Sequence, residues 1–198
     1  MKYLGIDPGA TVGFCIYENG KVLSFGEIAA EDNDASDRLV ALIEGHEGPI
    51  AIERTRVFSG RGADGVIKHA AGNDVADSCE QTGWLCAVAN GRTGARKDLL
   101  HGAWHCGGRC YLLERRAVIW QIHRHFGQQI KGDAAVWQAM LLEHGGKDAM
   151  QGPKQGKRAT RKSAAIPDRP AGHLHGMGNH ARAAFATAWA LQQFLETT

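Results

Sequence analysis

The N-terminal stretch constrains the fold most, because a short apolar run there ends in a carboxylate and a second apolar run follows at once. Residues 3–6 have the composition of a buried central strand, which ends at Asp7. Pro8 lacks a backbone N–H and Gly9 tolerates positive φ, so we expect the chain to turn directly after Asp7. Asp7 would then stand at a strand end, facing either a cleft or, as in most such triplets, solvent.

Three further patterns extend this start into an α/β domain. Asn19-Gly20 separates two apolar stretches and predicts a hairpin, since both central residues of such a turn need positive φ. Residues 34–45 predict a helix with an Asp or Ser cap and a glycine stop. Residues 49–52 predict a second buried strand, which also ends in a carboxylate, Glu53. The expected order is therefore three strands, a helix and a fourth strand.

The remaining two thirds of the chain mix helical periodicity with irregular stretches. The expected elements are a helix at 73–89, an irregular basic stretch at 91–108, a last strand at 110–113, a short turn carrying Trp120, a helix capped by Asp133 and running to Leu142, and a final helix at 179–195. Residues 145–178 lack periodicity and are rich in Gly, Pro, Lys and Arg, which predicts a flexible basic insert.

Length and composition indicate a single globular domain over residues 1–198. The chain is 43% hydrophobic and 22% charged, and 198 residues suffice for one well-packed core. No apolar run is long enough to span a membrane, and the N-terminus lacks a basic-then-apolar signal pattern. We therefore expect a cytoplasmic protein without a membrane partner.

The five cysteines argue against a disulfide framework in such a protein. His101, His105, Cys106 and Cys110 lie within ten residues and could hold zinc. No Cys-x2-Cys knuckle is present, however, and Cys110 is expected to begin a strand. Zinc at this group is left open.

Three motifs carry a resemblance to a known family. The segment from Gly5 to Gly9, with Asp7 at its centre, is similar to the opening of RuvC-type Holliday junction resolvases, which have a ribonuclease H-like fold. The strand ending in Glu53 and the helix starting near His180 resemble two further motifs of that family. A weaker similarity links the opening to actin-like ATPases and sugar kinases, but their second phosphate hairpin and adenosine motif are not found.

The resemblance implies a mixed five-stranded sheet, in which an antiparallel three-strand meander is joined by parallel strands and flanked by helices. In that fold the first and fourth strands are neighbours, which would bring Asp7 and Glu53 together. The alternative for Glu53 is a strand-end ion pair with Arg54 or Arg56.

The last helix of the family carries the pattern Asp/His-x-x-Asp-Ala-x-Ala-x-Ala. His180 matches its first position, and three small residues match its end: Ala184, Ala186 and Ala188. Ala183 stands where the family has its last aspartate. Either the chain is an engineered inactive variant or it is a naturally inactive relative that only binds branched DNA; the otherwise intact motifs favour the first account.

The function that this resemblance implies is resolution of four-way DNA junctions by a homodimeric endonuclease in a bacterial or phage-infected cell. Asp7, Glu53 and His180 would hold two Mg²⁺ or Mn²⁺ ions, which prefer hard oxygen ligands. The missing carboxylate at Ala183 would weaken one ion site. Alternatives are a catalytically inactive branched-DNA-binding protein or an ATP-binding protein of actin-like fold. Trp120 and Lys131 loosely resemble the phage-encoded branch.

Cations distributed over several loops are the candidates for DNA contact. They are Arg54, Arg56, Arg61, Arg96, Lys131, Lys154, Lys157, Arg158, Arg161 and Lys162. The last five belong to the basic insert, which would emerge just before the final helix. A polyanion contact is one interpretation of such a cluster, and a solvated loop is the other.

Four cations of the insert allow a test of this contact: Lys157, Arg158, Arg161 and Lys162. Changing all four to alanine should weaken binding to a labelled four-way junction and flatten its salt dependence, because cations near phosphates release condensed counterions. Thermal stability should hardly change, since the segment has few apolar residues to bury. Unchanged affinity and salt slope would identify a spacer and leave DNA contact to the loops around Arg61 and Arg96.

Overall fold

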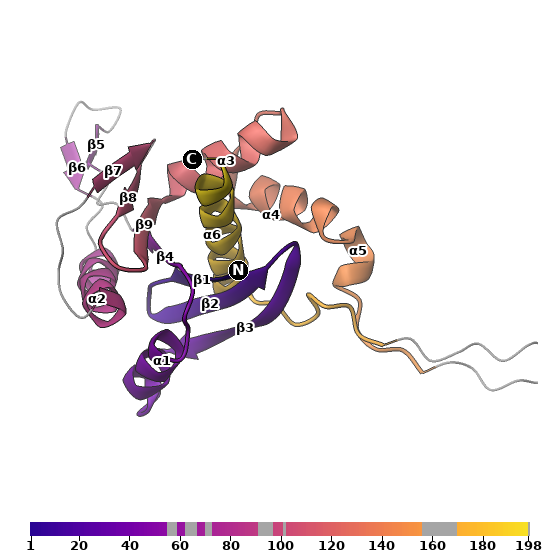
Figure 1. Cartoon of the computed structure of the whole chain (residues 1–198), viewed down its shortest axis with the longest axis horizontal. Coiled ribbons are helices and arrows are strands. Elements are labelled where there is room, and N and C mark those ends of the chain that lie inside the picture. The colour runs from indigo at the N-terminus through magenta and orange to yellow at the C-terminus, as the bar shows by residue number, and fades with distance from the viewer. Residues whose placement is uncertain are drawn as a thin grey trace, which may run out of the picture.

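The computed structural model describes residues 1–54, 59–61, 67–69, 73–90, 97–100, 102–155 and 170–197. It has an α/β architecture, in which a seven-stranded mixed sheet has the strand order β3-β2-β1-β4-β9-β8-β7 and helices cover both faces (Figure 1). Two short strands form a separate sheet, β5-β6. None of the helices in the described ranges has both the length and the apolar character that a membrane crossing requires.

The N-terminal half of the sheet follows the predicted order. Its strands are β1 (Lys2–Asp7), β2 (Thr11–Glu18), β3 (Lys21–Ala29) and β4 (Ile50–Arg54). Asn19 and Gly20 both have positive φ, 46° and 80°, so the predicted hairpin is confirmed. β4 runs parallel to β1, with Gly5 opposite Ala51, and this confirms that the first and fourth strands are neighbours.

The prediction of five strands is wrong because the C-terminal half of the sheet contains two further strands. They are β7 (Lys97–Leu100) and β8 (Ala103–His105), which lie beyond β9 (Cys110–Glu114); the separate pair is β5 (Ser59–Arg61) and β6 (Ile67–His69). β9 is parallel to β4 on one side and pairs with β8 antiparallel on the other, with His105 opposite Tyr111. A stretch that was expected to be irregular thus pairs with the open edge of β9. Its two strands were not predicted because three or four residues show too little alternation of apolar and polar side chains.

The helices divide between the two faces of the sheet. They are α1 (Ala35–Glu44), α2 (Asn73–Asn90), α3 (Arg115–Phe126), α4 (Gly132–Glu143), α5 (Gly146–Ala149) and α6 (Asn179–Glu196). Side chains of α1 and α2, such as Leu39 and Leu85, share one core cluster with Leu4 of β1. Side chains of α3, α4 and α6 form the second cluster on the other face, where Trp189 is completely buried.

Three sequence-based expectations for the C-terminal half need correction. α3 is a helix of 12 residues where a short turn was predicted, and its Trp120 stacks on Phe194 of α6. Asp133 does not cap α4, whose N-cap is Lys131 without a side-chain cap bond. The ends of the predicted flexible insert pack into the core, since Leu174 is buried and its N–H donates to the carbonyl of Ala149. Residues 156–169 of the insert lie outside the described part of the chain.

α6 lies directly on β1 and β2 because glycines face it. A Cβ on Gly5 would come within 2.0 Å of the Ala184 carbonyl oxygen, and one on Gly13 within 2.1 Å of the His180 backbone. Since no real Cβ approaches that closely, only glycine permits this contact. The start of the helix is thereby held next to Asp7, which pairs with Gly13 in the β1–β2 ladder.

A carboxylate from β3 fixes the N-terminus of the same helix. Glu27 Oε1 accepts hydrogen bonds from the backbone N–H groups of His180, at 2.9 Å, and Ala181, at 3.3 Å. The first N–H groups of a helix have no intrahelical partner, and a negative charge there also interacts favourably with the helix dipole. Three strands therefore determine where α6 begins.

Gly5→Ala should destabilise the fold, because the new methyl group would overlap the backbone of α6. We expect the unfolding free energy, measured by urea denaturation, to fall by about 2–3 kcal/mol. Gly9→Ala is the matched control, since its Cβ would lie at an ordinary 3.6 Å from the carbonyl oxygen of Thr11. Equal stability of the two variants would contradict the close packing of helix and sheet.

Candidate active site

A cavity of about 570 Å³ opens where β1 and β4 end and α6 begins. It is lined by Asp7, Glu53, Arg115, Asp133, Ala134, Val136, Trp137, Gln138, Asn179, His180, Arg182 and Ala183. All four residues predicted for the catalytic centre are in this set: Asp7, Glu53, His180 and Ala183. The structure thus brings together positions from three separate parts of the sequence.

Asp7 sits at the end of β1 and contacts the imidazole of His180. Nδ1 of His180 lies 3.0 Å from Asp7 Oδ2. Burial raises the pKa of Asp7 above its ordinary value, and the hydrogen bond from His180 partly opposes this. The turn after Asp7 is tied to α2, because the N–H of Gly9 donates to Gln81 Oε1 at 2.7 Å.

Glu53 is the more perturbed of the two acids. Its Oε2 lies 3.1 Å from the hydroxyl of Thr187 and accepts a hydrogen bond from Arg115 Nη1 at 3.3 Å. Burial raises the pKa of Glu53 to about 7; Arg115 opposes the rise, and the charge of Asp7 adds to it. Two partly desolvated carboxylates that repel each other are a site at which a further cation is favourable.

Thr187 connects Glu53 to the backbone of α6. Its hydroxyl lies 2.9 Å from the carbonyl oxygen of Ala183, so one proton is shared between this acceptor and Glu53. Thr187 stands four residues after Ala183, one helical turn further on. The sequence pattern gave no reason to single it out.

Arg115, Asp133 and Arg182 are the charged residues of the site that sequence reasoning did not assign to it. Arg115 Nε and Nη2 donate to Asp133 Oδ1, at 3.0 and 2.5 Å, while Nη1 reaches Glu53. The strand order could have pointed to Arg115. β9 lies beside β4, and Arg115 directly follows the last residue of β9, so it comes close to the end of β4 where Glu53 lies. Glu53 therefore does have an arginine partner, which is neither Arg54 nor any other residue of its own strand.

Arg54 projects away from this cavity. Successive side chains of a strand point to opposite faces, so Arg54 and Glu53 diverge. Arg54 Nη1 lies 3.6 Å from Glu114 Oε1, and its guanidinium lies 5.0 Å from the centre of the Trp104 ring. The structure does not bring this predicted DNA-binding residue to the Asp7 cavity.

The other predicted DNA-binding cations are only partly described. Lys131, just before α4, and Lys154 are exposed, and Arg61 belongs to β5. Six positions lie outside the described residues: Arg56, Arg96, Lys157, Arg158, Arg161 and Lys162. Their contact with DNA stays a prediction.

The residues considered for zinc do not form a site in the described ranges. His101 is outside those ranges, and Cys106 and Cys110 are buried and not joined in a disulfide. His105 points elsewhere, since its ring stacks on Tyr111 and its Nε2 lies 3.1 Å from the Gly108 carbonyl oxygen. Hydrogen bonds with the neighbouring thiols of Cys106 and Cys86, together with burial, raise the pKa of Cys110 far above its ordinary value, which disfavours the thiolate that zinc requires.

Donor chemistry in the Asp7 cavity fits one divalent ion better than two. Asp7 and Glu53 offer the carboxylate oxygens that Mg²⁺ and Mn²⁺ prefer, and His180 offers a nitrogen. Ala183 offers no side-chain donor where a second ion would need one. In the described part of the chain no three His, Cys, Asp or Glu side chains form a ready metal-binding group. At this site the donors bond instead to one another and to Arg115.

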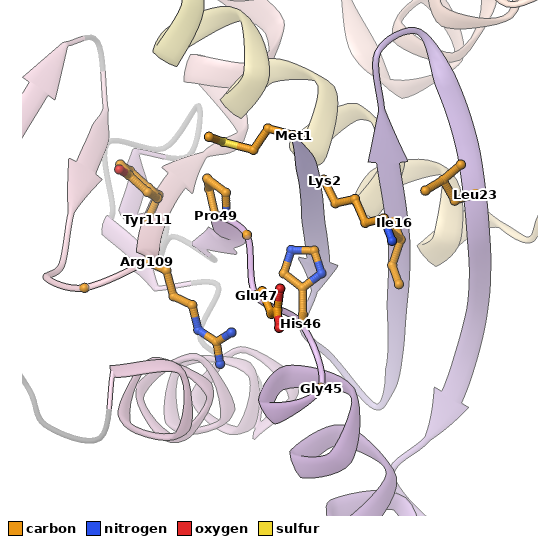
Figure 2. A pocket seen from close by; sticks show the side chains of 12 residues that line it. Met1, Lys2, Ile16, Leu23, Gly45, His46, Glu47, Pro49, Arg109 and Tyr111 are labelled. Atoms are coloured by element: carbon orange, nitrogen blue, oxygen red, sulfur yellow. The ribbon is translucent and has the colours of Figure 1, made fainter.

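A second cavity, of about 690 Å³, lies at the opposite end of the same strands (Figure 2). Lys2, Pro49 and Tyr111 line it near the starts of β1, β4 and β9. Its Arg109 donates to the carbonyl of Ile43 at 2.7 Å. Ligands of open α/β sheets bind at the carboxyl ends of the strands, and the paired acids are at that end. We therefore place the functional site at Asp7 although this second cavity is larger.

Comparisons of the chain with protein-family models, curated proteins and solved structures gave no match. The assignment of the site consequently depends on its geometry and on the sequence motifs that led to it.

Deprotonation of Glu53 should lower the free energy of unfolding as the pH rises, and Glu53→Gln removes this effect. The pKa of Glu53 is about 7 in the folded protein against an ordinary 4.5, so its stabilisation is complete below pH 4.5 and is lost as the pH rises through about 7. The unfolding free energy of Glu53→Gln relative to the unsubstituted chain should rise by roughly 3 kcal/mol across this range. Urea denaturation at a series of pH values measures it, and a flat difference would contradict the raised pKa.

Proposed function

We propose that this chain has the framework of a metal-dependent endonuclease of ribonuclease H-like fold, related to the RuvC-type resolvases and directed at four-way DNA junctions. One observation carries the proposal: Asp7, Glu53 and His180 line a single cavity together with Ala183. In this proposal the chain is inactive or weakly active as it stands, because Ala183 replaces a ligand carboxylate.

The arrangement of the sheet supports the ribonuclease H-like assignment. An antiparallel meander leads through α1 into β4, which is parallel to β1, and a C-terminal helix crosses the strands that carry the acids (Figure 1). β7 and β8 are additions at the edge of β9, far from β1 in the strand order. They leave the core of the proposed fold unchanged.

Each residue has a specific role in the proposed chemistry. A bound divalent ion would activate water and stabilise the leaving oxygen of a phosphodiester. Asp7 and Glu53 supply carboxylate oxygens to that ion, and the imidazole of His180, held against Asp7 at 3.0 Å, supplies nitrogen. Glu27 positions His180 from behind by bonding its backbone N–H.

The proposed partners follow from the resemblance and from symmetry. A four-way junction with twofold symmetry suits a homodimer, because the same surface then meets equivalent arms. The exposed Lys131 and Lys154 and the basic insert are the proposed backbone contacts.

Ala183→Asp tests the enzyme directly. Position 183 is three residues after His180, so the new carboxylate would occupy the same helix face and line the same cavity. We expect the variant to cut a labelled four-way junction in Mg²⁺ or Mn²⁺, with products resolved on a denaturing gel. A folded variant that makes no incision would contradict the enzyme proposal.

Asp7→Asn in the Ala183→Asp background is the control for this experiment, because it removes the central ligand while it preserves side-chain volume. Incision should disappear in the double variant. The competing proposal is a branched-DNA-binding protein without nuclease function. It predicts that junction binding is the same in all three chains and that none of them cuts.

A further inference from the structure

We propose that Arg115 is the second cation of this site: its guanidinium replaces a second divalent ion and binds a non-bridging oxygen of the DNA phosphate. This inference rests on the proposed function and assigns a role to a residue that the family motifs do not include. It makes the site a one-metal site.

Arg115 lies where such a cation is needed. Its Nη1 is 3.3 Å from Glu53 Oε2, and it lines the same cavity as Ala183, the position without a carboxylate. Its side chain is only 26% exposed, so solvent screens its charge little. A second divalent ion bound to Glu53 would meet this fixed positive charge.

The charges around the cavity agree with one ion. Three carboxylates line it (Asp7, Glu53 and Asp133), and two guanidinium groups oppose them (Arg115 and Arg182). Counted by formal charge, −1 for each carboxylate and +1 for each guanidinium group, these five side chains sum to −1. One divalent ion changes this to +1, which the single negative charge of a phosphodiester neutralises. Two ions would leave the complex with a charge of +2.

Arg115 also has donors to spare for a phosphate. Arginine carries five N–H donors, and the three bonds to Asp133 and Glu53 use one donor on each nitrogen. One N–H on each terminal nitrogen remains and is available to a non-bridging phosphate oxygen. Asp133 holds the plane of the guanidinium through two bonds, so little further ordering is required. Arg182, in contrast, is packed over the ring of Trp137 at 4.7 Å.

The competing interpretation is a purely structural bridge between Glu53 and Asp133. That role predicts lower thermal stability in Arg115→Ala and no change in junction binding, because no phosphate would contact the guanidinium. A cation that competes with metal and binds phosphate predicts two results together: tighter metal binding when its charge is removed, and weaker junction binding when lysine replaces it.

The first measurement is Mn²⁺ binding to the protein alone, followed by the electron paramagnetic resonance of the free ion. The unsubstituted chain should bind one Mn²⁺ per chain, and Arg115→Ala should bind it at least about tenfold more tightly because a nearby positive charge is gone. Arg116→Ala is the matched control, since this neighbour pairs with Glu114 and does not line the cavity. It should leave Mn²⁺ affinity unchanged.

Arg115→Lys distinguishes the effect of the positive charge from that of the guanidinium's shape. It also replaces the alanine variant in this test if that variant does not fold. It keeps the positive charge, so its Mn²⁺ affinity should stay close to that of the unsubstituted chain. Lysine has a single side-chain nitrogen, so it cannot reach phosphate as the guanidinium does while it is held by Asp133, and junction binding in EDTA should weaken about tenfold. Unchanged junction affinity in the lysine variant would overturn the phosphate contact.

Two Mn²⁺ ions per unsubstituted chain, or equal affinity in a folded Arg115→Ala protein, would overturn the inference. Neither result depends on nuclease activity. If Ala183→Asp never cuts DNA while Arg115→Ala tightens Mn²⁺ binding and Arg115→Lys weakens junction binding, the cation role stands and the endonuclease proposal fails.

Discussion

The close contact between α6 and the first two strands is the constraint on which the rest of the structure depends. Gly5 and Gly13 remove the side chains that would separate helix and sheet, and Glu27 holds the first turn of the helix. As a result, His180 reaches Asp7 and Thr187 reaches Glu53. A helix lifted from the sheet by one side-chain layer would lose both contacts.

Burial next to this helix creates the electrostatic character of the site. Asp7 and Glu53 are costly to ionise there, as their raised pKa values indicate, and their mutual repulsion adds to the cost. Arg115 relieves part of it without neutralising the cavity. The negative charge that remains on these two partly buried carboxylates makes a cation beside them electrostatically favourable.

Much of this site was predictable from the sequence, because strand-end acids depend on local patterns. The run before Asp7, the Asn19-Gly20 hairpin and the helix at His180 are all short-range signals, and each is confirmed as an element. Arg115 and Asp133 were not predicted as site residues, because their meeting depends on how α3 and α4 pack, and the sequence predicts only a turn and a capped helix there. β7 and β8 were missed because the edge of β9, rather than their own residues, makes them strands.

One face of α6 carries His180, Ala183 and Thr187 at successive turns, and each of these residues lies at a different part of the cleft. His180 meets the end of β1, Ala183 lines the open cavity, and Thr187 meets the end of β4. The helix rises about 1.5 Å per residue, so these three positions are spaced along α6 from the end of one strand to the end of the other. Substitutions on this one face of α6 can therefore change the chemical groups that line the cleft, while the strands of the sheet stay the same.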